Sequence, residues 1–267
     1  MSTPSYAMRD SMTMLRRNLK HAQRYPSMSL STIAMPVLML LLFNYVFGRA
    51  LGDGIGGTEA GATGAGGDYI DYIAPGIILM AATSGAVATA VSICSDMTEG
   101  IVNRFRTMPI SRASFLTGHV VGSVIQTMVS IACVVLVALA IGFRPNANPG
   151  EWIAAAGLLA LLTLALTWLA AGIGLVTKKV ETASNIPLPL TFLPFLGSAI
   201  VPPESMPSGM RWFADYQPFT PLIETLRGLL MGTGIGNDGY ISVAWCLGLA
   251  VVGYVWAKRA FAKGVRN

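Results

Sequence analysis

The stretch WIAAAGLLALLTLALTWLAAGIGLV, residues 152–176, has no charged side chain in 25 consecutive positions. An α-helix needs about 20 mostly apolar residues to cross the hydrocarbon core of a bilayer. This stretch therefore predicts a membrane-spanning helix. The composition of the whole chain agrees, because 53% of its 267 residues are hydrophobic and only 12% are charged, whereas a soluble domain has about 25% charged residues.

Apolar runs of the same character recur along the chain, separated by short charged clusters. We expect an all-α integral membrane protein with six transmembrane helices in a single domain, residues 1–267. The predicted spans are about 30–47, 72–93, 117–141, 152–176, 186–201 and 240–257. The fifth is short and contains Pro187, Pro189 and Pro194, which predicts a kinked helix or one that continues into a re-entrant piece.

The distribution of basic residues predicts the orientation of the chain. Fourteen of the 18 Lys and Arg residues lie in the N-terminal segment, the second and fourth loops and the C-terminal tail. The other loops carry nine of the thirteen acidic residues. Since positively charged loops stay on the cytoplasmic side, we expect a multi-pass protein with both termini in the cytoplasm.

Residues 1–28, before the first span, are predicted to be a cytoplasmic amphipathic segment. A helix here has an apolar stripe and a separate basic stripe, typical of a helix that lies in the membrane interface. The residues are Met12, Leu15 and Leu19 on the apolar stripe, and Arg16, Arg17 and Lys20 on the basic one. The alternative is an ordinary basic flank of a span. The glycine-rich loop 48–67 is expected to be an extracytoplasmic linker and is assigned no function.

The second cytoplasmic loop is predicted to contain a short helix outside the bilayer. Asp96 and Glu99 have the spacing of a helix N-terminal cap, and Pro109 stops the helix. Its apolar face consists of Ile101, Phe105 and Met108. Such a face must be buried against something, which favours docking of another subunit. The alternative is that this helix folds back onto the membrane surface.

The last extracytoplasmic segment, 202–239, is predicted to be a re-entrant helical hairpin. Thr220 or Gln217 is the expected helix cap, Pro221 lies near the first turn and Gly232 near the end. The predicted apolar face consists of Leu222, Ile223, Leu226, Leu229 and Leu230. Glu224 and Arg227, three residues apart, are expected to pair with each other or with a facing subunit. The alternative is a surface helix that packs on the ends of the spans.

Several functions are disfavoured by what the sequence lacks. No predicted span has an Asp, Glu, Lys, Arg or central His in its interior, whereas proton- or ion-coupled carriers generally place an ionisable group there. There is no G-x-x-x-x-G-K-[ST], G-x-S-x-G or H-E-x-x-H motif, and no metal site is expected. Polar span residues are expected to form interhelical hydrogen bonds. These residues are Gln126, Ser130, Thr163, Thr167, Thr191 and Ser198.

Two motifs resemble the ABC type-2 permease family, with the daunorubicin-resistance-like branch as the nearest. The first comprises Glu99, Gly100, Arg104, Phe105, Arg106, Pro109, Ile110, Ser111 and Arg112. The second comprises Met206, Pro207, Pro218, Phe219, Thr220, Pro221, Glu224, Leu226, Arg227 and Gly232. The resemblance covers nearly the whole chain and implies the membrane subunit of an ATP-driven exporter in a prokaryotic plasma membrane.

The resemblance also implies how such an exporter is assembled. Two permease subunits, identical or homologous, pair with two copies of a separate ATPase subunit, which binds ATP and Mg. The permease is then no enzyme, holds no cofactor and binds no nucleic acid. The implied ATPase-coupling residues are Asp96, Glu99, Gly100, Ile101, Arg104, Phe105, Arg106, Met108 and Pro109.

The expected substrate is a hydrophobic drug or a lipid, because the span faces are mainly aliphatic. A polysaccharide exporter and a non-transporting scaffold or immunity protein are the alternatives. A membrane lipid enzyme is disfavoured, because His21, His119 and the loop acids do not assemble into a catalytic cluster.

Overall fold

The computed structural model describes residue 16 and residues 26–47, 69–99 and 112–264. All the regular secondary structure in these ranges is helical. The elements in chain order are α2 (Pro26–Leu42), its π-helical continuation η1 (Phe43–Phe47), α4 (Tyr69–Thr98), α6 (Arg112–Ile141), α7 (Pro149–Val176), α8 (Val180–Asn185), α9 (Leu188–Phe192), η2 (Leu193–Leu196), η3 (Pro203–Ser205), α10 (Ser208–Tyr216), α11 (Phe219–Met231) and α12 (Asp238–Gly264).

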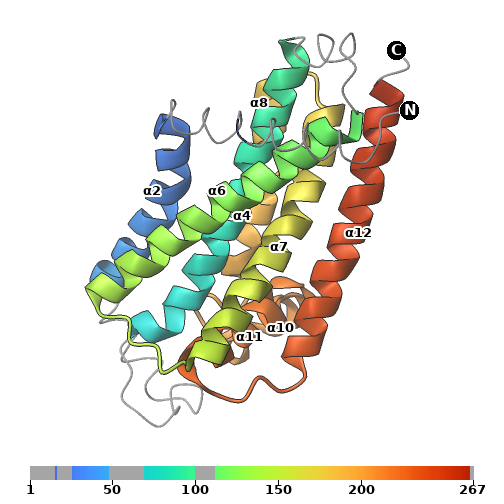
Figure 1. Cartoon of the computed structure of the whole chain (residues 1–267). Helices are drawn as coiled ribbons and strands as arrows, with labels where there is room; N and C mark the ends of the chain where they lie inside the picture. The colour runs from blue at the N-terminus through green and yellow to red at the C-terminus, as the bar shows by residue number, and fades with distance from the viewer. Residues whose placement is uncertain (1–15, 17–25, 48–68, 100–111, 265–267) are drawn as a thin grey trace.

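The long helices form a bundle with two different ends (Figure 1). The end that holds the start of α2 and the last residues of α12 is called the terminal end. The opposite end, where α10 and α11 lie, is called the cap end. Four helices, α4, α6, α7 and α12, are long and apolar enough to cross a membrane, and they lie where the second, third, fourth and sixth spans were predicted. The first predicted span, 30–47, contains a shorter apolar helix, Thr32–Val46.

The fifth predicted span, 186–201, is not a continuous helix. The chain passes from α8 at the terminal end to α10 at the cap end through α9 and η2 (Figure 1). We name residues 180–200 the broken crossing. Prolines 187, 189 and 194 lack the amide hydrogen that an interior helical position donates, and three such interruptions within eight residues disfavour a continuous helix. Short turns replace it, with Leu190 N donating to Pro187 O and Gly197 N to Pro194 O.

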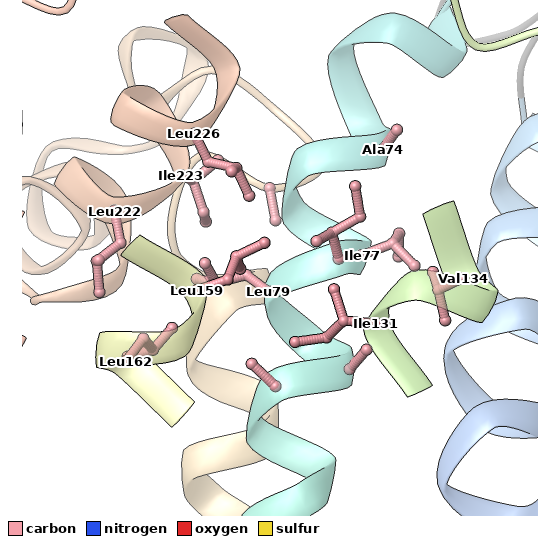
Figure 2. Close-up of a cluster of buried hydrophobic side chains, with 14 of the residues drawn as sticks. Ala74, Ile77, Leu79, Ile131, Val134, Leu159, Leu162, Leu222, Ile223 and Leu226 are labelled. Carbon is pink, nitrogen blue, oxygen red and sulfur yellow. The ribbon is translucent and has the colours of Figure 1, made fainter. Parts of the chain in front are cut away.

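Helices α4 and α7 lie at the centre of the bundle. In their apolar windows 72% and 56% of the residues are buried, against 28% in α6 and 22% in α12. Figure 2 shows side chains of α4, α6, α7 and α11 converging in one cluster that includes Ile77, Ile131, Leu159 and Leu226. The outward faces of α6 and α12 are apolar and exposed, as the surface of a membrane helix must be when lipid surrounds it.

Glycines allow α7 and α12 to pack closely. A Cβ atom on Gly172 of α7 would lie 2.6 Å from the ring of Trp256, and one on Gly253 of α12 would lie 2.8 Å from the backbone nitrogen of Leu169. Helices in lipid associate through close packing because burial from water contributes little there. Each helix thus has a glycine where the other comes closest: Gly172 faces the Trp256 ring, and Gly253 faces the backbone at Leu169.

Three of the six polar span residues expected to join helices bond within their own helix instead. Thr163 Oγ1 donates to Leu159 O at 2.7 Å, Thr167 Oγ1 to Thr163 O at 2.6 Å, and Ser130 Oγ to Gln126 O at 3.2 Å. These bonds stay within one helix because a hydroxyl easily reaches the carbonyl four residues earlier. The prediction of interhelical bonds is therefore wrong for these three hydroxyls.

Candidate functional site

Helix α11 is the buried element of the cap end. It begins at Phe219, has Pro221 in its first turn and ends at Met231, where Gly232 adopts the left-handed conformation with φ 69°, as the proline and glycine signals predicted. All five residues of its predicted apolar face are buried. The helix packs against α4, α7 and α12, so it forms part of the bundle interior.

The predicted helix cap of α11 is wrong. Pro218 occupies the cap position, and no side-chain cap bond forms. Instead, Thr220 Oγ1 donates to Ala214 O at 2.6 Å, and Gln217 Nε2 donates to Thr220 Oγ1 at 3.4 Å. Thr220 reaches back to α10 because the turn between the helices is short, and Gln217 in that turn donates to Thr220. They fix the start of α11 against the end of α10.

Arg227 of α11 is the centre of a polar cluster at the cap end. Its Nη1 donates to Glu224 Oε1 at 2.6 Å, so the expected pair forms within the chain. Its Nη2 donates to two backbone oxygens, Ser198 O at 2.8 Å and Tyr72 O at 3.2 Å. The guanidinium carbon also lies 3.9 Å from the centroid of the Tyr72 ring, within the range of a cation–π interaction.

These contacts explain how a largely buried charge is tolerated. Only 15% of the Arg227 side chain is exposed, against 36% for Glu224. A buried charge is costly unless it is paired and hydrogen-bonded, and the cluster supplies both a carboxylate and two carbonyls. In return, the guanidinium provides a donor for the Ser198 carbonyl, which lies where the broken crossing is no longer helical. Charge-assisted bonds of this type are about twice as strong as neutral ones.

The partners Tyr72 and Ser198 were not identified from the sequence as site residues. Both act through a backbone carbonyl, which every residue type possesses, and they lie 155 and 29 residues from Arg227 in the chain. The one side-chain signal was the aromatic ring of Tyr72 near the start of a predicted span. Their role follows only from the three-dimensional arrangement.

At the terminal end, Asp96 does not begin a separate helix. It lies in the last turns of α4, and its Oδ2 is 2.8 Å from His119 Nε2 of α6. Both side chains are largely buried, with exposed fractions of 14% and 8%. The cap interpretation is therefore wrong, because α4 continues beyond the apolar run and Asp96 has a partner on the neighbouring helix. Glu99 is exposed and lies in the turn that follows α4.

The other predicted site residues at the terminal end lie mostly outside the described residues. Arg16 is helical and exposed. Those outside are Met12, Leu15, Arg17, Leu19, Lys20, Gly100, Ile101, Arg104, Phe105, Arg106, Met108 and Pro109. Their roles at the interface and in coupling stay predictions.

Comparison with known proteins identifies the family. Residues 10–231 match the family model described as ABC-2 type transporter. The daunorubicin resistance ABC transporter permease protein DrrB1 of Streptomyces coeruleorubidus is 28% identical over 223 residues, covering 83% of this chain and 75% of that protein. The probable doxorubicin resistance ABC transporter permease protein DrrC of Mycobacterium tuberculosis is 23% identical over 223 residues, covering 84% and 77%.

A third relative extends over almost the whole chain. The inner membrane transport permease YadH of Escherichia coli strain K12 is 24% identical over 256 residues, covering 93% of this chain and 94% of that protein. The family match, these permease relatives and the four membrane-length helices agree with one another. The chain therefore belongs to the ABC-2 type transporter family and is a membrane permease.

Proposed function

We propose that this permease is the membrane subunit of an ATP-driven exporter that moves a hydrophobic or amphiphilic molecule, a drug or a lipid, out of the cytoplasm or the inner leaflet. The observation that carries the proposal is where charges lie in the four long helices. Every Asp, Glu, Lys, Arg and His in them lies within about two turns of a helix end. In the part of the chain that the structure describes, these four helices carry no mid-membrane group of the kind used for ion coupling, which favours an energy source in a partner subunit.

The relatives support the substrate class. Two of them bear names that refer to daunorubicin or doxorubicin resistance, and both drugs are flat aromatic amphiphiles. The exposed faces of α6 and α12 are aliphatic and aromatic, which suits contact with lipid or with a second permease subunit. A polysaccharide substrate gains no support from any contact in the described residues.

The terminal end faces the cytoplasm in this proposal, and residues 96–109 receive the ATPase. The Asp96–His119 pair supports this assignment, because it fixes the end of α4 to the start of α6, the two helices between which this segment lies. A segment anchored on both sides can transmit a displacement of the ATPase to α4, at the centre of the bundle, and to its neighbour α6. Two ATPase copies and a second permease complete the proposed assembly.

Transport is tested in inverted membrane vesicles that contain the permease together with the P-loop ATPase that the proposal requires as its partner. We expect ATP-dependent uptake of daunorubicin, abolished when the P-loop Lys of the ATPase is replaced. Uptake driven by a proton gradient without ATP would contradict the proposal. Active ATP hydrolysis by the assembled complex with no uptake of daunorubicin or of a fluorescent lipid would reject the substrate class.

Docking is tested by co-purification of the ATPase with permease variants. Phe105→Ala and Ile101→Asp should release the ATPase while the permease remains in the membrane, since burying a side chain of this size contributes about 1.5 to 3 kcal/mol. Lys179→Ala is the matched control, because Lys179 is exposed on the loop between α7 and α8. Unchanged co-purification of both docking variants would show that the ATPase binds elsewhere.

A further inference from the structure

Arg227 is the point at which three separate parts of the cap end are joined. Its guanidinium contacts α4 through Tyr72, the broken crossing through Ser198, and its own helix α11 through Glu224. A hydrogen bond is lost once donor and acceptor separate beyond about 3.5 Å. The cap end therefore cannot open between α4 and the broken crossing without breaking at least one of these bonds.

We propose that Arg227 is a positioning residue that acts as a latch, holding α4, the broken crossing and α11 together, and that its release opens the path by which the substrate leaves. The proposal rests on the exporter function above, and it assigns to one side chain the control of the outer exit. Substrate contact is not required of Arg227, because the latch acts by holding backbone segments in place.

A second observation supports a latch that can be released. Within the described residues, Ser198 Oγ, Gln217 Oε1 and Arg227 Nε are buried and have no hydrogen-bond partner. A buried polar atom without a partner carries a desolvation cost. In the closed arrangement, these three polar atoms at or near the latch have no hydrogen-bond partner. In an open arrangement, water could form hydrogen bonds with them. This narrows the free-energy difference between the closed and open states.

A third observation concerns the broken crossing, the segment that Arg227 holds through the Ser198 carbonyl. The broken crossing has only short helical pieces, α8, α9 and η2, so it can shift locally without tilting a long rigid helix. A Cβ atom on Gly197 would lie 2.5 Å from Gln217 Nε2 and 2.7 Å from Thr220 Oγ1. The backbone of the broken crossing is therefore pressed against the start of α11, next to the carbonyl that Arg227 holds.

The chain offers a matched control for Arg227. Arg211 lies on α10 at the same end, and its Nε is 3.8 Å from Asp215 Oδ2. Both side chains of this pair are about half exposed, with fractions of 51% and 49%. Both residues belong to α10, so this ion pair joins no separate elements. The substitutions Arg211→Gln and Arg227→Gln remove the same charge from neighbouring helices.

The test uses Ser198→Cys as a reporter in the full permease–ATPase complex in proteoliposomes. Ser198 has no exposed surface, and its bond to Arg227 uses the carbonyl, which the substitution keeps. Labelling of residue 198 by a membrane-impermeant maleimide is followed by mass spectrometry. We expect protection without ATP, and labelling at least tenfold faster during ATP turnover but not with a non-hydrolysable analogue.

The Arg227 variants are then made in the reporter background. Arg227→Gln should raise ATP-free labelling at least tenfold and lower the drug transported per ATP hydrolysed, with the ATPase still bound and active. Arg227→Lys should fall between, because one ammonium cannot make the same set of bonds and ring contact. Arg211→Gln should match the unsubstituted reporter.

The latch is overturned if labelling of residue 198 is equal with and without ATP turnover, or if Arg227→Gln labels no faster than Arg211→Gln. A folding defect is recognised separately, because Arg227→Gln would then lose the ATPase. In that event the latch is judged by two other measurements: the labelling rate of Arg227→Lys without ATP, and the increase in labelling of the unsubstituted reporter during ATP turnover. If no ATPase co-purifies with the unsubstituted chain, the exporter proposal fails. The latch is then tested by comparing the labelling of Arg227→Gln and Arg211→Gln without ATP.

Discussion

Helices α10 and α11 are consecutive in the chain and lie at the same end of the bundle, yet they differ in almost every physical respect. Helix α11 has ten buried residues, whereas α10 has only Ala214 buried. Trp212 and Tyr216 of α10 are 65% and 70% exposed. Both helices carry an Arg and an acid about one turn apart. A pair of opposite charges therefore does not by itself determine whether a helix is buried in the bundle or exposed.

The difference lies in what each arginine contacts besides its acid. Arg211 is near Asp215 on its own helix, whereas Arg227 also binds carbonyls of two other segments. Exposed pairs contribute about 0 to 1 kcal/mol because water screens the charges and the side chains lose entropy. A largely buried cation with several acceptors contributes more. The following substitutions separate the two cases.

Exchange of the two charges should have the largest effect in α11. The double variant Glu224→Arg and Arg227→Glu keeps an ion pair but removes the Arg227 Nη2 group, which donates to the carbonyls of both Ser198 and Tyr72. Hydrogen bonds of charged groups contribute about 1.5 to 3 kcal/mol each, so we expect the free energy of unfolding to fall by about 3 to 6 kcal/mol. Titration with sodium dodecyl sulfate in mixed micelles measures this fall.

The same exchange on α10, Arg211→Asp with Asp215→Arg, is the control and should change stability by less than about 1 kcal/mol. An exchange in α11 that restores full stability would mean that the carboxylate alone holds Arg227. The i, i+3 spacing by itself predicts that the exchanged pair is tolerated, because each charge keeps a partner on the same helix. The bonds to the carbonyls of Ser198 and Tyr72 predict the opposite outcome, a loss of stability in the exchanged variant.

Truncation of a buried side chain should have the next largest effect. Leu222 of α11 is fully buried in the cluster of Figure 2, and Leu222→Ala should lower stability by about 2 to 5 kcal/mol because a cavity forms. Met210 of α10 is 48% exposed, so Met210→Ala should have little effect. Equal effects of the two substitutions in the same titration would contradict the difference between the helices.

The smallest effect is expected at the hydroxyl contact between α11 and α12. Thr225 Oγ1 and Ser242 Oγ are buried and 3.0 Å apart. Thr225→Val keeps the shape of the side chain and should cost about 0.6 kcal/mol, the average found for hydrogen bonds between membrane helices, and no more than the observed maximum of about 1.7 kcal/mol. Thr163→Val is the control, since Thr163 bonds within α7. A double-variant cycle with Ser242→Ala measures the coupling between the two hydroxyls.

The long helices and α11 could be predicted from the sequence because their signals are local. Runs of apolar residues set four of the spans, and Pro221 with Gly232 marked the ends of α11. The ends of the long helices were less predictable. Helix α4 continues to Thr98, beyond the apolar run, because Asp96 is stabilised by His119 from α6. Hydropathy alone cannot detect such a partner.

The arrangement around Arg227 could not be predicted for a different reason. Its charge and its spacing from Glu224 were visible in the sequence, but its other acceptors are backbone oxygens brought close by the fold. The broken crossing was foreseen as a kinked helix or as one that continues into a re-entrant piece, since prolines show where a helix is interrupted but not what replaces it. Coupling residues from Gly100 to Pro109 lie outside the described ranges and stay predictions.

The close contacts at Gly172 of α7 and Gly253 of α12 have a consequence for biosynthesis. Helix α7 emerges from the ribosome well before α12, with α8 to α11 synthesised between them. Until α12 arrives, the groove at Gly172 is lined by lipid instead of the Trp256 ring. The close contact between α7 and α12 therefore forms only after α12 has been inserted, so a chain truncated before α12 should leave this face of α7 without its partner and be more sensitive to membrane proteases.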